Sequence, residues 1–136
     1  MNHCSRLGAT LLLLFAVFSV DCALLVHDAA ADGVTSRVQF ARGGSSATVK
    51  GAVIRGDRDV YIVGANGGQS MSVNISSLER NAVFQIQGPD GNELRGAGET
   101  DDAMEWSGVL PASGDYRIIV GGTRGNASYT LRVGIR

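Results

Sequence analysis

The chain has 136 residues, the length of one ordinary domain, and 19 of them are glycine. Its 12 basic and 13 acidic residues give a formal net charge of −1 at pH 7, which argues against nucleic acid and an anionic membrane as partners. All of its cysteines and histidines lie within the first 31 residues.

The N-terminal segment has the pattern of a secretory signal peptide. Arg6 precedes an apolar run at residues 11–20 that is too short to span a bilayer. Small alanines follow, so we expect cleavage after Ala31, with a site after Ala23 as the alternative. A lipidated Cys22 is a further alternative.

The predicted organisation is a cleaved signal peptide at residues 1–31 and a single folded domain at residues 32–136. This organisation places the mature protein in the periplasm or outside the cell, with no membrane segment after cleavage. Cleavage also removes every cysteine and histidine, which excludes disulfides, Cys/His zinc sites, cysteine nucleophiles and Ser-His-Asp triads. We therefore expect a protein that is not an enzyme and that holds no cofactor or metal.

Short runs of alternating apolar and polar residues recur along the remaining chain, separated by glycine, asparagine, aspartate and serine. This pattern is typical of β-strands joined by turns. We expect eight strands, at residues 37–40, 47–54, 60–63, 70–75, 83–87, 104–110, 116–120 and 129–135. Eight short strands in about 105 residues favour an all-β fold, namely a two-sheet antiparallel β-sandwich of the jelly-roll type.

Two segments between the predicted strands carry charged side chains. Asp57, Arg58 and Asp59 lie where we expect a hairpin tip, which is either an ordinary charged turn or a binding loop. The acidic residues at 99–105 form either a solvated loop or a weak calcium site, although the spacing of an EF-hand is missing. Trp106 follows the alternation of its strand and is expected in the core, with stacking on a sugar as the alternative.

The run at residues 108–122 predicts an antiparallel hairpin, because turn residues separate two strand-like stretches. Tyr116 begins the second stretch on the face that is expected to point into the core. The expected structural residues of this hairpin are Leu110, Pro111, Ser113, Gly114 and Tyr116.

Thr123 and Arg124 lie in a glycine-flanked loop before the last predicted strand. Glycines allow such a loop to adopt unusual backbone conformations. Arg124 is either a solvated loop arginine or an arginine that enters an acidic cleft of a partner and anchors an interface there.

Together these residues resemble the family of secreted and periplasmic inhibitors of goose-type (g-type) lysozyme. The most specific part is the Leu-Pro-Ala-Ser-Gly-x-Tyr run at residues 110–116 and its spacing to Thr123 and Arg124. The resemblance covers nearly the whole chain after residue 31, and its other positions are Val38, Phe40, residues 44–47, Gly51, Gly56, Tyr61, Ala65, Gly68, Gln69, Gly88, Pro89, Val120, Tyr129 and Val133. The same framework is similar to the bacterial pre-peptidase C-terminal domain, a jelly-roll module of secreted proteases.

The resemblance to the inhibitors implies a protein that binds g-type lysozyme and blocks its peptidoglycan-binding cleft with loops at one end of the sandwich. It carries this role over to Thr123 and Arg124, and to Asp57, Arg58 and Asp59, which occupy a loop where enterobacterial members have tyrosines. The loop of Arg124 is several residues shorter than in those members and lacks their second basic residue. The resemblance to the pre-peptidase domain implies instead a non-inhibitory module that binds a glycan, such as peptidoglycan, or a protein.

Overall fold

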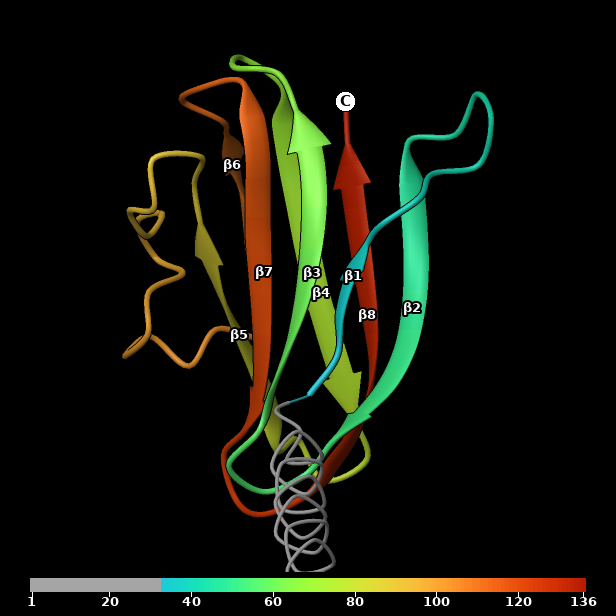
Figure 1. Ribbon diagram of the computed structural model, residues 1–136, viewed down its shortest axis with the longest axis vertical. Helices are drawn as coiled ribbons and strands as arrows, with labels where there is room; N and C mark the ends of the chain where they lie inside the picture. The colour runs from blue at the N-terminus through green and yellow to red at the C-terminus, as the bar shows by residue number, and fades with distance from the viewer. Residues whose placement is uncertain (1–32) are drawn as a thin grey trace, which may run out of the picture. The chain divides into compact units, whose positions relative to one another are not determined.

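A computed structural model describes residues 33–136, so the predicted signal peptide at residues 1–31 lies outside the described residues. Eight strands form two four-stranded sheets (Figure 1). The strands are β1 (Thr35–Arg37), β2 (Ser46–Val53), β3 (Arg58–Ala65), β4 (Ser70–Ser77), β5 (Ala82–Gln87), β6 (Glu105–Val109), β7 (Gly114–Gly122) and β8 (Ala127–Ile135). The first sheet has the order β1-β3-β7-β5 and the second has the order β2-β8-β4-β6. The predicted all-β sandwich of eight strands is confirmed.

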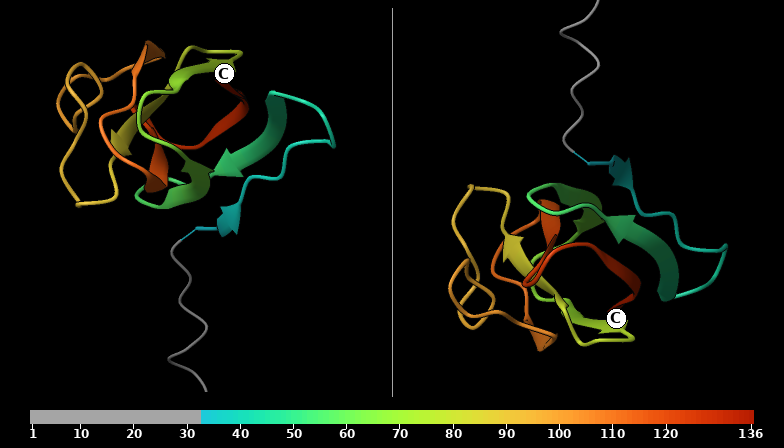
Figure 2. Two further views of the ribbon diagram at one scale, coloured as in Figure 1. Left: turned by 90° about the horizontal axis from the view of Figure 1, so that it is seen from above. Right: turned by 90° about the horizontal axis from the view of Figure 1, so that it is seen from below.

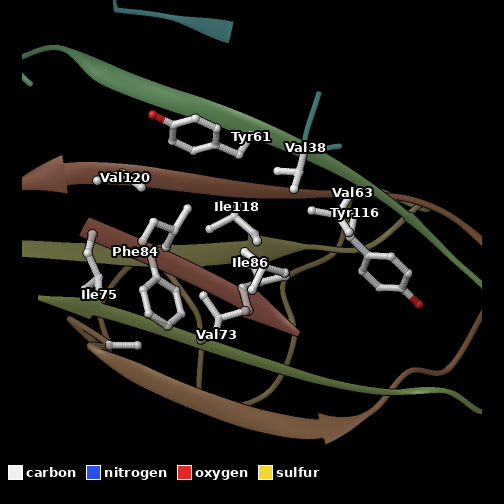
Figure 3. Close-up of a cluster of buried hydrophobic side chains, with 14 of the residues drawn as sticks. Val38, Tyr61, Val63, Val73, Ile75, Phe84, Ile86, Tyr116, Ile118 and Val120 are labelled. Carbon is white, nitrogen blue, oxygen red and sulfur yellow. The ribbon is translucent and has the colours of Figure 1, made fainter. Parts of the chain in front are cut away.

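The core lies between the two sheets and follows from the alternation of the strands. Inward-pointing residues of β3, β4, β5 and β7 meet in one apolar cluster (Figure 3). In β4, for example, Met71, Val73 and Ile75 are buried while the intervening serines and asparagine are exposed. Within the described residues there is no helix long and apolar enough to cross a membrane.

No two strands that follow each other along the described chain are hydrogen-bonded neighbours, because each connection crosses from one sheet to the other. The hairpin predicted at residues 108–122 is therefore wrong: β6 pairs with β4, whereas β7 lies between β3 and β5. The hairpin predicted around residues 57–59 is wrong for the same reason, since β2 and β3 lie in different sheets. Alternation reports which face of a strand is buried, but it carries no information about the partner strand.

The first strand also differs from its predicted position at residues 37–40. β1 ends at Arg37 and pairs with β3 in parallel, so the sandwich is not wholly antiparallel. Val38 follows the strand, is buried, and donates its backbone N–H to the Ile62 carbonyl over 2.9 Å. Val38 and Phe40 pack on the core just after β1, so their apolar side chains led to a predicted strand that lies too late in the chain.

The arch from β6 to β7 is held by the tyrosine that the sequence placed in the core. The Tyr116 hydroxyl donates to the Ala112 carbonyl over 2.6 Å and accepts the Ala112 N–H over 3.2 Å. Leu110 is buried, and Ser113 accepts the backbone N–H of Gly67 over 2.8 Å. The arrangement resembles a tyrosine corner, in which a buried tyrosine bonds back to the backbone just upstream.

The long connection between β5 and β6, residues 88–104, runs along one side of the sandwich (Figure 2). It covers the edge of β5 through backbone bonds from Leu94 to Ile86 and from Ile86 to Ala97, both of 2.9 Å. Such cover protects an edge strand from pairing with another chain. Within the loop, the carboxylates of Glu93 and Asp101 accept backbone N–H groups. Trp106 packs at the border of the core, and its ring N–H donates to a backbone carbonyl of the same connection.

Candidate partner-binding surface

Three connections meet at one end of the sandwich, the lower end in Figure 1: residues 54–57 between β2 and β3, residues 78–81 between β4 and β5, and residues 123–126 between β7 and β8. They carry four arginines, counting the first residue of β3, and these are Arg55, Arg58, Arg80 and Arg124. We call this surface the arginine end. All four side chains are exposed.

Hydrogen bonds tie the three connections of the arginine end to one another. The Asn126 side chain accepts the backbone N–H of Arg55 over 2.7 Å, and the Asn126 carbonyl accepts the side chain of Asn81 over 3.0 Å. The backbone N–H of Thr123 donates to the Asn81 carbonyl over 2.9 Å. Because each connection is bonded to its neighbour, the side chains of this end are held in fixed relative positions.

Arg124 is exposed at the tip of the β7–β8 connection. One guanidinium nitrogen donates to the Glu79 carbonyl over 3.1 Å, which leaves other donors of the fork free for a carboxylate. The tight path of this loop requires glycine, since a Cβ at Gly122 would lie 2.5 Å from the Gly125 carbonyl and Gly125 has a φ of 76°. The local sequence thus projects the arginine on a short, well-defined loop.

The structure brings the predicted residues Thr123 and Arg58 together. Both line a hollow of about 240 Å³ on the outer face of β5 and β7, which also includes Glu99 and Asp102. Arg58 extends across Gly121, where a Cβ would come within 3.3 Å of its side chain. Asp57 lies at the turn before β3 and is half-buried. Four of the five predicted partner-binding residues therefore lie at or beside the arginine end.

Asp59 does not share that surface, and its predicted contact with a partner is wrong. Its side chain is 2% exposed and accepts the backbone N–H of Val34 over 2.9 Å and the hydroxyl of Tyr129 over 2.6 Å. The Tyr129 hydroxyl lies 2.6 Å from that of Tyr61. Burial, and then the hydrogen bond to Asp59, raises the pKa of Tyr129 above its usual value. Asp59 is thus part of a buried polar network that joins the two sheets.

The sequence contained a signal for this burial. Asp59 lies two positions before Tyr61 and four before Val63, so all three lie on the inner face of β3. Space for the tyrosine hydroxyls comes from Gly51, where a Cβ would lie 2.5 Å from the Tyr129 oxygen.

The β4–β5 turn was not predicted as part of the site. Leu78 is 99% exposed in this turn, next to Glu79, whose carbonyl accepts the hydrogen bond from Arg124. The sequence does show a leucine in an otherwise polar turn. Alternation of apolar and polar residues identifies strands, so it does not draw attention to an apolar residue in a turn.

A second polar surface lies on the outer face of the β2-β8-β4-β6 sheet. The register aligns Thr48, Arg132, Asn74 and Glu105 in one row across the four strands. This row and its neighbours line a shallow hollow of about 630 Å³, whose other polar residues are Ser46, Ser72 and Ser107. Among residues 33–136 there is no group of three or more carboxylate, histidine or cysteine side chains that could hold a metal ion.

Comparison with known proteins finds relatives that are inhibitors of g-type lysozyme. The inhibitor of g-type lysozyme of Escherichia coli is 37% identical over 109 residues, which cover 77% of this chain and 79% of that protein. The crystal structure of Aeromonas hydrophila PliG, a periplasmic inhibitor of g-type lysozyme, is 36% identical with a TM-score of 0.66, and the match covers 78% of this chain and all of that one. No protein-family model matches the chain.

The pre-peptidase C-terminal domain of a Bacillus anthracis collagenase shares the fold with a TM-score of 0.58 but only 19% identity, over 76% of this chain and 98% of that one. The sandwich with its crossing connections therefore defines a jelly-roll-like class that includes both kinds of protein. Within this class, the identity to the Escherichia coli protein decides the family. The chain belongs to the family of g-type lysozyme inhibitors, as the sequence motifs predicted.

Proposed function

We propose that this protein is a periplasmic inhibitor of g-type lysozyme and that its arginine end enters the substrate cleft of the enzyme. The observation that carries the proposal is the position of Arg124. The protein belongs to the inhibitor family, and Arg124 is exposed at the tip of a loop that is hydrogen-bonded to its neighbours. The named relatives are themselves inhibitors of g-type lysozyme, and the A. hydrophila protein is periplasmic.

The chemistry of the arginine end suits a glycosidase cleft. Enzymes that hydrolyse glycosidic bonds generally place carboxyl groups beside the scissile bond. An exposed guanidinium can form paired, charge-assisted hydrogen bonds with such a carboxylate. Arg55, Arg58, Arg80 and Arg124 outnumber the two carboxylates of the same connections, Asp57 and Glu79, so this end carries a net positive charge that favours approach to an acidic partner. Inhibition in this proposal requires only that the cleft be occupied, with no covalent step.

Lysis of peptidoglycan by a g-type lysozyme, followed with increasing amounts of the mature protein, tests the proposal. We expect lysis to fall to zero as the inhibitor exceeds the enzyme, and to recover when substrate concentration is raised, because both compete for the cleft. Undiminished lysis at a large excess of inhibitor would rule the proposed function out.

The hollow on the outer face of the second sheet favours one alternative, a module that binds a glycan such as peptidoglycan without inhibiting an enzyme. Its row of hydroxyl, amide and charged groups around Arg132 offers hydrogen bonds to sugar hydroxyls and carboxylates. Binding of soluble peptidoglycan fragments that is lost in Arg132→Ala, in a protein that leaves lysozyme fully active, would support the alternative. Inhibition of lysozyme without fragment binding would reject it.

A further inference from the structure

The most exposed apolar side chain of the described residues lies at the arginine end. Large apolar side chains that are mostly exposed within residues 33–136 are Val34, Ile54, Leu78 and Val109. Leu78 is 99% exposed and Ile54 is 62% exposed, and both line one hollow of about 370 Å³ between the β2–β3 and β4–β5 connections. Single exposed leucines are common, but two apolar side chains that share a hollow mark an interaction site more specifically.

The turn that carries Leu78 is fixed by several bonds. Ser77 accepts the backbone N–H of Arg80 on its carbonyl over 3.1 Å and that of Asn81 on its hydroxyl over 3.0 Å. Asn81 is 5% exposed, and its side chain donates to the β7–β8 connection. The backbone of the turn at Leu78 is therefore ordered before a partner binds, which lowers the entropy that binding must overcome.

Charge around this apolar hollow indicates the kind of partner. Arg55 and Arg80 flank it in sequence, and Arg124 donates to the backbone carbonyl of Glu79. Glu79 is the one charged residue that lines the hollow itself, so the arginines around the hollow outnumber its single carboxylate. Within the described part of the chain, the single ion pair joins Arg37 and Asp115, so the arginines of this end form none. A symmetric dimer through this surface would bring like charges together. The surface fits a partner with acidic groups and an apolar recess beside them.

We propose that Leu78 and Ile54 form an apolar anchor that packs on the rim of the lysozyme cleft while Arg124 enters it. The inference rests on the proposed inhibitory function and adds to it a specificity contact from the β4–β5 turn, which was not predicted from the sequence. An apolar contact beside a charged one excludes water from the ion pair and strengthens it.

The test compares the inhibition constants of Leu78→Ser, Leu78→Met and the matched control Val109→Ser in the lysis assay. Val109 is 67% exposed and pairs with Ser70 at the start of β4, whereas Leu78 follows the end of β4 at Ser77. We expect Leu78→Ser to weaken inhibition about tenfold, the scale of an interfacial apolar contact. Leu78→Met keeps an apolar side chain and is expected to inhibit within about twofold of the wild type, as is Val109→Ser.

Thermal melts of all three variants should coincide with that of the wild type, because the changed side chains are exposed. If the wild type inhibits and Leu78→Ser inhibits equally well, the anchor is disproved while the proposed function stands. An equal loss in Val109→Ser would also overturn the anchor, since the effect would not be local. If the wild type itself fails to inhibit, the proposed function fails and the anchor fails with it.

Discussion

The hydroxyl of Tyr116 makes two hydrogen bonds to Ala112, although the residue is fully buried; its ring lies at the edge of the apolar cluster (Figure 3). Tyr116→Phe keeps the packing and removes these bonds, so we expect it to destabilise by about 1 kcal/mol. Tyr116→Ala also creates a cavity, and we expect a loss of about 3 kcal/mol or more. Denaturant unfolding measures both values. Equal stabilities of the two variants would mean that packing of the ring contributes nothing.

Asp59 is buried, although the sequence predicts an exposed position at a turn. Asp59→Ala leaves the Tyr129 hydroxyl and the Val34 N–H without their acceptor, and we expect a loss of about 1–3 kcal/mol. Asp59→Asn keeps one acceptor oxygen of the two, so its loss of stability should be smaller than that of Asp59→Ala. Thermal melts of both variants test this order. A melting temperature of Asp59→Ala equal to that of the wild type would restore the surface position expected from the sequence.

At the scale of elements, β1 is the strand with the fewest ladder bonds, and an exposed ion pair helps to hold it. Arg37 on β1 contacts Asp115 on β7 with a shortest distance of 2.8 Å. The hydrogen bonds from Arg37 hold the pKa of Asp115 below its usual range. A carboxylate with a lowered pKa stabilises the folded state above its unfolded pKa, about 3.9, and this contribution is lost as the pH falls through the folded pKa.

We therefore expect the protection of the Val38 and Val60 amides against hydrogen exchange to decrease below about pH 4, because both bonds attach β1 or its end to β3. In Arg37→Ala the protection should already be reduced at neutral pH and should change less on acidification. Protection factors of these amides, measured across the acidic range, provide the test. Identical profiles in both proteins would show that the ion pair does not hold β1.

Most of the strands were predictable, because β3, β4, β5, β7 and β8 each bury one face and therefore alternate. β4 begins at the expected Ser70, and β8 ends at the expected Ile135. Their pairing was not predictable, since an arch and a hairpin use the same turn residues, as the run from Pro111 to Gly114 shows. For the candidate site, the family motif indicated Thr123 and Arg124. The motif does not include Leu78. The proposed role of Leu78 depends on Ile54, which lines the same hollow but is distant in sequence.

In the whole molecule, the crossing connections form two ends of different composition. One end holds the Tyr116 corner and the bonds from Ser113 and Leu110 to the β3–β4 connection. The other end carries the arginines on three connections that are bonded to one another. Since the core lies between these ends, changes of exposed side chains at the arginine end should alter binding and leave stability within about 0.5 kcal/mol.

The dissociation constant of the complex with g-type lysozyme, measured by calorimetry for the wild type, Arg124→Ala and Arg132→Ala, tests whether the arginine end binds the enzyme. Both substitutions remove an exposed arginine, but Arg132 lies on the outer face of the second sheet. We predict that Arg124→Ala weakens binding by about 2 kcal/mol, roughly thirtyfold, and that Arg132→Ala stays within about twofold of the wild type. If Arg124→Ala binds as tightly as the wild type, or if Arg132→Ala loses more affinity than Arg124→Ala, the proposed role of the arginine end is wrong.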